Sequence, residues 1–160
     1  MAQARGRALL VLIGLAATAC GGDPAPPPPA TPYQDPGAVE AGAYRLRYAL
    51  TLTTDLPAEI AGSYGIEQRR NLALLVLTLE RRDAQPGNRV GAERIEADAI
   101  SLTGERHALE LARHEDSGGP TWLAPVEVRH RVPLAIEIRA SATSASPEIR
   151  ARLTREFRLQ

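Results

Sequence analysis

The sequence predicts an all-β domain, an immunoglobulin-like β-sandwich of about seven strands with one short helical turn. Two observations predict this fold. Apolar and polar residues alternate with a period of two through most of residues 42–160, the pattern of strands that bury one face. Glycine and proline recur between these stretches as turn signals. Regularly spaced short strands of this kind are typical of a sandwich.

The strands are expected where the alternation is regular. The predicted ranges are residues 44–52, 72–77, 95–102, 109–112, 134–139 and 149–159. The run at 72–77 is apolar without a break, which indicates a central strand covered on both faces. Asp55 is expected to cap a short helical turn that ends near Gly62. Thr103-Gly104 predicts a hairpin. The aromatic side chains expected in the core are Tyr44, Tyr48, Tyr64, Trp122 and Phe157.

Residues 1–19 are predicted to be a secretory signal peptide. Arg5 and Arg7 precede an apolar run at residues 8–19, and small residues end this run. The run is too short to span a bilayer, because a spanning helix needs roughly 20 residues. The segment is therefore expected to direct secretion and to be removed.

Cys20, the only cysteine, follows this segment directly. Residues 15–21, Leu-Ala-Ala-Thr-Ala-Cys-Gly, resemble the lipobox of bacterial lipoproteins, in which the cysteine thiol is acylated. Cys20 is therefore the predicted lipidation site, and the membrane is a predicted partner through this anchor. The alternative is ordinary cleavage after residue 19, which leaves a free thiol. Gly21, in place of Asp, favours the outer membrane, so the predicted location is the cell envelope, facing the periplasm.

Residues 20–41 are predicted to contain the anchor cysteine and a proline-rich linker outside the folded domain. Seven of the 13 prolines lie within residues 24–36. Such sequence favours extended polyproline II structure, which acts as a semi-rigid spacer. The β-sandwich domain is then expected to occupy residues 42–160.

Composition and motifs argue against several function classes. The chain has 19 Lys and Arg and 19 Asp and Glu residues, so it lacks the positive surplus of a nucleic-acid-binding protein. His107 and His114 would lie on opposite faces of a strand, and His130 lies in a charged stretch. No G-x-S-x-G elbow or glycine-rich phosphate loop occurs. We therefore expect no metal, no cofactor and no enzymatic activity.

Two segments resemble an uncharacterised bacterial envelope family, domain of unknown function 4426. One begins with Tyr-Gly-Ile at residues 64–66 and continues to Asn-Leu-Ala-Leu-Leu at residues 71–75. The other is Ala-Ile-Ser-Leu-Thr-Gly-Glu at residues 99–105, where Ser101 and Glu105 replace the expected Asn and Gln. The resemblance runs from about residue 44 to residue 157. It implies an immunoglobulin-like sandwich and no established activity.

The predicted function is that of a membrane-tethered, non-enzymatic envelope lipoprotein whose sandwich binds or scaffolds another envelope component, such as an envelope protein. The alternative is an envelope hydrolase or a small-ligand-binding protein with an unrecognised site. The first candidate interaction surface is Tyr64, Arg69, Arg70 and Asn71, because a buried strand follows this polar segment and would hold it still. The same segment can also be purely structural.

A second candidate surface depends on strand pairing. Arg45 and Arg47 lie on one predicted strand, and Arg150 and Arg152 lie on another. If these strands pair, the four side chains form a basic stripe that fits an anionic partner. The alternative is that they protect sheet edges from aggregation.

Overall fold

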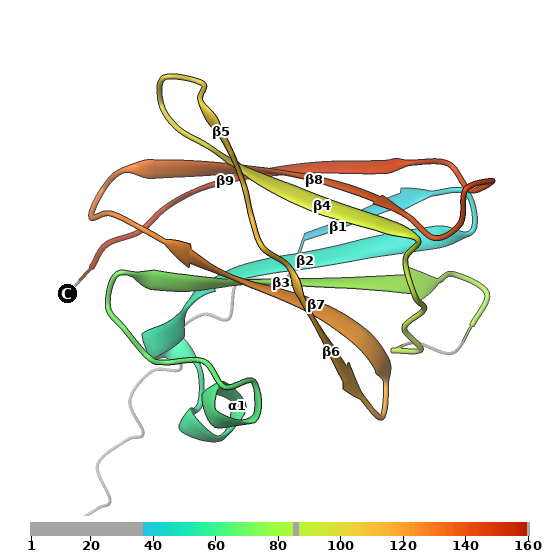
Figure 1. Cartoon of the computed structure of the whole chain (residues 1–160), viewed down its shortest axis with the longest axis horizontal. Coiled ribbons are helices and arrows are strands. Elements are labelled where there is room, and N and C mark those ends of the chain that lie inside the picture. The colour runs from blue at the N-terminus through green and yellow to red at the C-terminus, as the bar shows by residue number, and fades with distance from the viewer. Residues whose placement is uncertain (1–36, 85–86, 160) are drawn as a thin grey trace, which may run out of the picture. The chain divides into compact units, whose positions relative to one another are not determined.

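The computed structural model describes residues 37–84 and 87–159. In these residues nine strands form two antiparallel sheets that pack face to face (Figure 1). Sheet A has the order β1-β2-β3-β7-β6, and sheet B has the order β5-β4-β8-β9. The bounds are β1 (Gly37–Ala41), β2 (Tyr44–Leu52), β3 (Leu72–Arg81), β4 (Arg94–Ile100), β5 (Arg106–Ala108), β6 (Ala112–Asp116), β7 (Gly119–Glu127), β8 (Pro133–Ser141) and β9 (Ile149–Glu156). The predicted immunoglobulin-like β-sandwich is confirmed.

The core lies between the sheets and follows the alternation of the sequence. Leu46, Leu75, Ile136 and Ile138 are at most 1 % exposed, and they point inward from β2, β3 and β8. Trp122 from β7 is also buried in this cluster. Burial of such side chains removes apolar surface from water and is the main stabilising contribution to the fold.

Strand β3 is central in sheet A and is covered on both faces, as its unbroken apolar run predicts. Leu72 and Leu74 are buried, although they lie outside the cluster between the sheets. The segment between β2 and β3 packs on this side with η1 (Thr53–Asp55) and α1 (Ala58–Ser63) (Figure 1). The predicted cap is wrong: Asp55 ends η1, and Pro57 is the N-cap of α1, without a side-chain hydrogen bond.

The first strand shows that the predicted end of the linker is too late. Residues 37–41 form β1, which pairs with β2 from Gly37 opposite Tyr48 to Ala41 opposite Tyr44. Gly37 permits this pairing because the ring of Tyr48 lies over it, and a Cβ atom there would come within 2.3 Å of that ring. The five residues of β1 include one glycine and two alanines, so their alternation is a weak signal in the sequence.

The predicted strand at residues 109–112 is also wrong. Leu109 and Leu111 lie where the chain leaves β5 in sheet B and enters β6 in sheet A. Both are half-buried against the core, and the N–H of Leu109 donates to the carbonyl of Ala97 at 2.8 Å. Both side chains point toward the core while the chain passes from one sheet to the other. In the sequence this gives the same alternation of apolar and polar residues as a strand.

The aromatic side chains divide into two groups. Trp122 and Phe157 are buried, and Tyr44 and Tyr48 pack against the edge of the core. Tyr64 lies outside this cluster, which differs from the prediction. Its ring packs edge to face on His114 of β6, with the ring centroids 5.0 Å apart.

Candidate ligand-binding cleft

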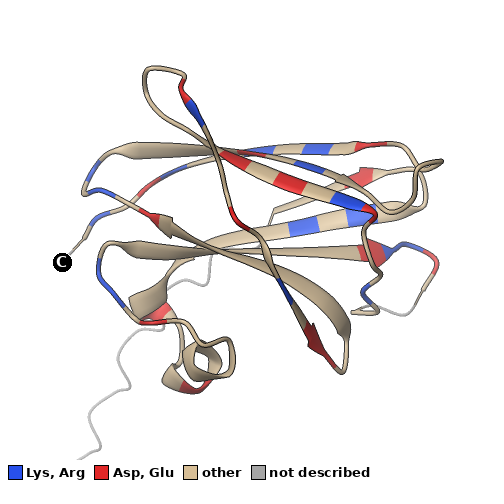
Figure 2. Cartoon of the chain, in the orientation of Figure 1, with Lys and Arg blue, Asp and Glu red and all other residues tan. Residues whose placement is uncertain are grey.

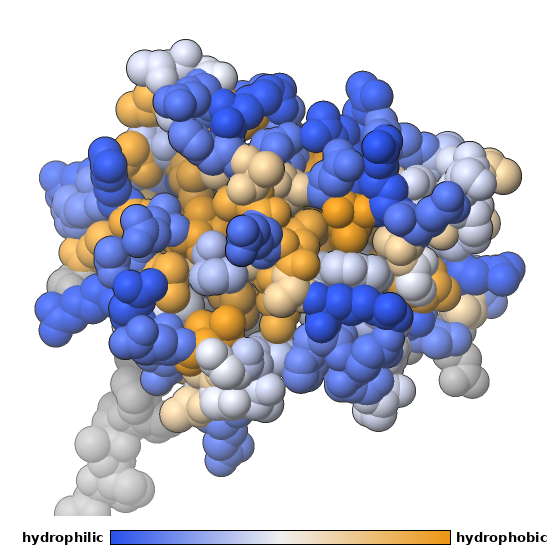
Figure 3. All heavy atoms as spheres, viewed as in Figure 1, coloured by the Kyte–Doolittle hydropathy of each residue, from blue (hydrophilic) through white to orange (hydrophobic). Residues whose placement is uncertain are grey.

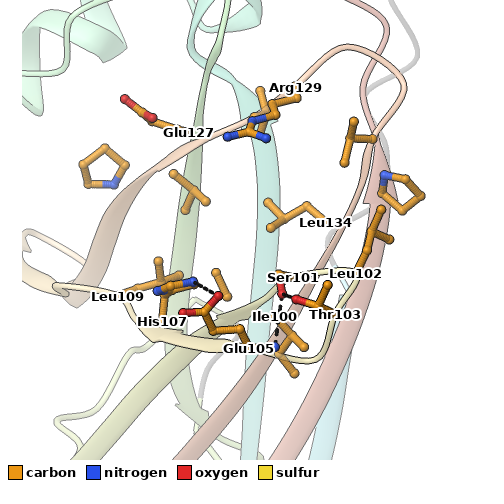
Figure 4. A pocket seen from close by; sticks show the side chains of 16 residues that line it. Ile100, Ser101, Leu102, Thr103, Glu105, His107, Leu109, Glu127, Arg129 and Leu134 are labelled. Carbon is orange, nitrogen blue, oxygen red and sulfur yellow. Dashed lines mark hydrogen bonds and ion pairs between the residues drawn. The ribbon is translucent and has the colours of Figure 1, made fainter.

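A cleft of about 710 Å³ opens at one end of the sandwich, where the β4–β5 hairpin faces the end of β7 and the β7–β8 loop. Figure 3 shows apolar side chains gathered in the middle of the face that carries β4 to β7. In the close-up of the cleft, Leu134 from β8 lies between the hairpin and Arg129 of the β7–β8 loop (Figure 4). Volumes of roughly 300–1,000 Å³ are usual for small-molecule sites.

The cleft exists because two strands end early on this side of the sandwich. Strand β6 pairs with β7 only as far as Ala112 opposite Leu123, and β5 pairs with only three residues of β4. Beyond Leu123, β7 keeps its pairing with β3, but no described residue pairs with its other edge. Pro125 occupies this stretch, and a proline fits an unpaired edge because it has no N–H to donate.

The walls of the cleft are mainly apolar. Val126 and Val128 are buried at its base, and Leu109 and Leu134 are half-buried. Leu102 at the tip of the hairpin is 74 % exposed, and it lies beside an apolar cleft rather than alone on the surface. Contiguous exposed apolar surface is characteristic of binding sites.

The hairpin that forms one wall is held by its own polar groups. The N–H of Glu105 donates to Ser101 Oγ at 3.1 Å, and the Ser101 and Thr103 hydroxyl oxygens are 2.8 Å apart. Gly104 has φ +85, a conformation that suits glycine and closes the turn. Glu105 then lies with its Oε2 3.6 Å from Nε2 of His107 at the rim (Figure 4). This is the predicted Thr103-Gly104 hairpin.

On the other side of the sandwich, side chains fill most of the space between the sheets. Tyr48 covers Gly37 there, and the guanidinium of Arg155 donates to the carbonyl of Leu50. The Arg155 guanidinium also lies 5.0 Å from the centre of the Phe157 ring. Burial lowers the pKa of Arg155 from its ordinary value, and the charge of Asp55 opposes this effect. The space left there is about 160 Å³, so the cleft is the larger opening.

The predicted surface at residues 64–71 is fixed by polar contacts with the preceding η1 segment. Buried Thr53 accepts a hydrogen bond from the N–H of Arg69 at 2.9 Å and donates to its carbonyl at 3.0 Å. Gln68 Nε2 donates to the carbonyl oxygens of Thr53 and Leu56. The segment is therefore held still, as the prediction requires.

Three of the four predicted residues of this surface lie together and exposed: Arg69, Arg70 and Asn71. Arg69 is 3.7 Å from a carboxylate oxygen of Glu67, and Tyr64 lies apart, half-buried on His114. The structure thus gives Tyr64 a packing role and leaves the arginines available for binding.

The predicted surface adjoins the cleft. The N–H of Val128, a residue of the cleft wall, donates to the carbonyl of Asn71 at 2.9 Å. The segment at residues 99–105 forms the opposite wall. One segment of the family resemblance, residues 99–105, therefore lines the cleft, and the other contacts a lining residue through Asn71, which the sequence alone did not indicate.

The predicted basic stripe is wrong, because its two strands lie in different sheets. Arg45 and Arg47 belong to β2 of sheet A, and Arg150 and Arg152 belong to β9 of sheet B. Each of these arginines is close to a carboxylate; the partners are Glu40, Glu80, Glu148 and Glu137, in the same order. They cannot form one continuous positive surface.

The described residues offer no metal centre or membrane-spanning helix. No group of three or more His, Cys, Asp or Glu side chains in residues 37–84 and 87–159 could hold a metal ion. His107 and His114 lie in different sheets, and Nδ1 of His130 accepts a hydrogen bond from the N–H of Leu159 at 3.1 Å. None of the described helices is long and apolar enough to cross a bilayer. Cys20 lies outside the described residues.

The fold and the cleft define a β-sandwich protein with an apolar opening between its sheets. The family model described as Domain of unknown function (DUF4426) matches residues 38–158, and the chain belongs to this family. The resemblance carried by residues 64–75 and 99–105 is thereby confirmed. Comparison with curated proteins finds no match.

Solved structures share the fold. The crystal structure of a DUF4426 family protein from Pseudomonas aeruginosa PAO1 matches with a TM-score of 0.64 and 19 % identity, over 80 % of this chain and 98 % of that chain. Two structures of FetP from uropathogenic Escherichia coli strain F11, one a copper-bound variant, match with TM-scores of 0.48 and 0.49. Their identities are 14 % and 11 %, over 78 % and 79 % of this chain and 95 % and 97 % of those chains.

Proposed function

We propose that this protein is a membrane-tethered, non-enzymatic lipoprotein of the bacterial cell envelope, and that its sandwich binds a ligand in the cleft. The observation that carries the proposal is the cleft itself, of about 710 Å³ and lined mainly by apolar side chains. Pockets of this size with a few polar groups at the rim are the usual form of binding sites. Residues 99–105, one segment of the family resemblance, line it, and Asn71 of the other segment is hydrogen-bonded to the lining residue Val128.

The polar groups at the cleft support binding rather than catalysis. A serine, threonine or cysteine hydrolase needs a nucleophile within hydrogen-bond reach of a base. The hydroxyl of Ser101 is already engaged with the N–H of Glu105 and with Thr103, within its own hairpin. His107 contacts Glu105 at 3.6 Å, and no described serine, threonine or cysteine hydrogen-bonds to it. This arrangement can orient a ligand without reacting with it.

The tether in this proposal rests on the sequence. A signal peptide at residues 1–19, acylation of Cys20 and a proline-rich spacer would hold the sandwich near the outer membrane, facing the periplasm. A binding module on a spacer can reach ligands or partner proteins close to the membrane surface.

The proposal is tested with N-phenyl-1-naphthylamine, an uncharged apolar dye whose fluorescence rises in apolar surroundings. The purified protein should bind the dye saturably. Leu102→Glu should weaken binding, because it adds a charge at the mouth of the cleft. Ile60→Glu is the matched control: Ile60 is also an exposed apolar residue, 43 % exposed, but it lies on α1 away from the cleft. Absence of saturable binding, or equal effects of the two variants, would contradict the proposal.

A further inference from the structure

Four arginines at one end of the sandwich form no ion pair with any residue that the structure describes. Most arginines in residues 37–84 and 87–159 lie within 4.0 Å of a carboxylate, such as Arg106 beside Asp98 and Glu137. Among the described residues, no side-chain hydrogen bond or ion pair is made by Arg70, Arg129, Arg131 or Arg158. We name these four residues the basic end. Unpaired guanidinium groups are available to an anion, and Arg matches phosphate and carboxylate geometry well.

Backbone contacts bring the basic end together from three separate segments. The hydrogen bond from Val128 N–H to Asn71 joins the segments that carry Arg129 and Arg70. The N–H of Arg131 donates to the carbonyl of Phe157 at 2.8 Å, which joins the β7–β8 loop to the segment after β9. Figure 2 shows several basic positions in blue around the C-terminus, at the left end of the view.

Two carboxylates lie at the ends of strands in the two sheets, Glu127 of β7 in sheet A and Glu156 of β9 in sheet B. Neither lies within ion-pair distance of a described arginine. The four arginines outnumber these two carboxylates, so the basic end keeps a positive surplus although the whole chain has a formal net charge of +0, while Glu105 lies with His107 at the opposite rim of the cleft. An exposed surplus of this kind attracts anionic ligands.

The backbone at Arg131 supports a functional role for this end. Arg131 has φ +55, and it is the only non-glycine residue in the described ranges with positive φ. This left-handed conformation is unfavourable for an arginine, and such strain is found more often at binding sites. The Arg131 side chain makes no hydrogen bond or ion pair with a described residue, and only its backbone N–H is bonded, to the carbonyl of Phe157.

The basic end and the cleft are continuous. Arg129 lines the cleft beside Val128, and Val132 lies at the same rim. In Figure 4, Arg129 lies across the apolar opening from the hairpin that carries His107 and Glu105. The apolar cleft thus leads to the guanidinium of Arg129, and Arg131 follows two residues further along the same loop. This arrangement suits a molecule with an apolar chain and an anionic head.

We infer that the ligand of the cleft is an anionic amphiphile, with its acyl chain between the sheets and its phosphate or carboxylate at the basic end. This inference rests on the proposed function, because it names the ligand class for the same cleft. Burial of apolar surface binds the acyl chain of the ligand. Arg129 and Arg131 bind its anionic head group and so favour an anionic ligand over an uncharged one.

The test compares an anionic probe with an uncharged one on protein purified from cells that express the full chain. The anionic probe is cis-parinaric acid, a fluorescent fatty acid, and the uncharged probe is N-phenyl-1-naphthylamine. Arg129→Gln combined with Arg131→Gln should weaken parinaric acid about tenfold, as expected when charge-assisted hydrogen bonds are lost. Binding of the uncharged dye should not change. Higher salt should weaken only the anionic probe.

The matched control is Arg113→Gln combined with Arg150→Gln, which removes two exposed arginines away from the basic end. This variant should bind both probes as the wild type does. If the Arg129 and Arg131 variant binds parinaric acid normally while the uncharged dye still binds, the inference is wrong and the proposed function stands. If neither probe binds saturably, both are wrong.

Displacement of parinaric acid distinguishes the sources of the anionic head. Palmitate carries a carboxylate, and lysophosphatidylglycerol carries a phosphate with the same net charge. Lysophosphatidylcholine has a similar chain but a zwitterionic head. At least one of the two anions should displace the probe more strongly than the zwitterion, and the stronger one identifies the head group. Equal displacement by all three would overturn the inference.

Discussion

At the scale of one residue, Arg131 combines a positive charge with an unfavourable backbone conformation. A glycine substitution relieves the backbone conformation and removes the charge. Its φ of +55 costs an L-residue roughly 1–2 kcal/mol. Glycine avoids this cost but loses more backbone entropy on folding, by about 0.5–1 kcal/mol. Arg131→Gly should therefore leave the free energy of unfolding unchanged or raise it by up to about 1 kcal/mol, as measured by urea denaturation.

The control for this prediction is Arg129→Gly, two residues away, where φ is not positive. This substitution should lower the free energy of unfolding by about 0.5–1 kcal/mol, because glycine gives no conformational benefit there. Equal losses in the two variants would mean that the backbone at Arg131 is not strained. If Arg131→Gly stays stable, it also removes a charge from the basic end without disturbing the fold.

The burial of individual side chains could be predicted from the sequence only where local alternation decides it. Leu46 and Ile136 are buried as their parity indicates. Thr53 is buried as well, and its hydroxyl is hydrogen-bonded to the backbone of Arg69, 16 residues away. No local sequence pattern predicts this contact. The sequence likewise does not predict that Arg129 forms no ion pair with a described residue, because ion pairing depends on which carboxylates the fold brings near the arginine.

At the scale of elements, the β6–β7 hairpin is anchored by Asp116. The N–H of Gly118 donates to Asp116 Oδ1 at 2.8 Å, and the Arg89 guanidinium contacts the same carboxylate. The Gly118 hydrogen bond and then Arg89 lower the pKa of Asp116 below its ordinary value, and desolvation opposes them. Arg89 also bonds to Thr121 of β7, so the hairpin and the segment before β4 are tied together.

This anchor predicts a pH dependence of stability. Because the folded state favours the carboxylate, its contribution is present above the ordinary Asp pKa of about 3.9 and is lost as the pH falls through the lower folded value. Asp116→Asn should therefore destabilise the protein at pH 7, and its difference from the wild type should shrink below about pH 4. Urea denaturation across this range measures the effect.

The control is Glu115→Gln on the same strand, which breaks an exposed ion pair with Arg113. Exposed pairs contribute little, so this change should stay within about 0.5 kcal/mol at both pH values. A constant difference between Asp116→Asn and the wild type from pH 7 to pH 3 would show that the carboxylate charge does not anchor the hairpin.

The long strands could be predicted because their alternation extends over many residues, as in β2 and β8. The errors concern short elements and crossings. Three of the five residues of β1 are glycine or alanine, so its alternation is weak. Leu109 and Leu111 keep an alternating pattern while the chain changes sheets. Strand partners cannot be predicted from such patterns, which is why a stripe of Arg45, Arg47, Arg150 and Arg152 could be stated only on the condition that their strands pair; they do not.

At the scale of the whole molecule, the cleft results from the points at which strands stop pairing. The β4–β5 hairpin and the segment ending at Asn71 are far apart in sequence, and each is recognisable alone. Only the fold shows that the hairpin lines the opening and that Asn71 is bonded to Val128 on its other side. The fold class was therefore accessible from the sequence, whereas the site depends on long-range pairing that alternation does not encode.

At the scale of the whole chain, we predict that acylation of Cys20 anchors the protein to a membrane. Basic residues, a short apolar run and small residues precede this cysteine, and a proline-rich spacer follows it. One acyl chain binds a membrane only marginally, so stable anchoring requires a second hydrophobic signal or additional acylation. In cells fed an alkyne-labelled palmitate, the wild type should incorporate the label and sediment with membranes.

Cys20→Ser should remove the label and release the protein from the membrane fraction, while its far-ultraviolet circular dichroism stays that of a β protein. The fold should not change, because the sandwich described from Gly37 onward does not include Cys20. An unlabelled wild type in the soluble fraction would instead indicate ordinary secretion with a free thiol. In that case the protein would not be anchored to a membrane. The proposed ligand binding in the cleft would be unaffected, because the dye-binding experiments do not depend on the anchor.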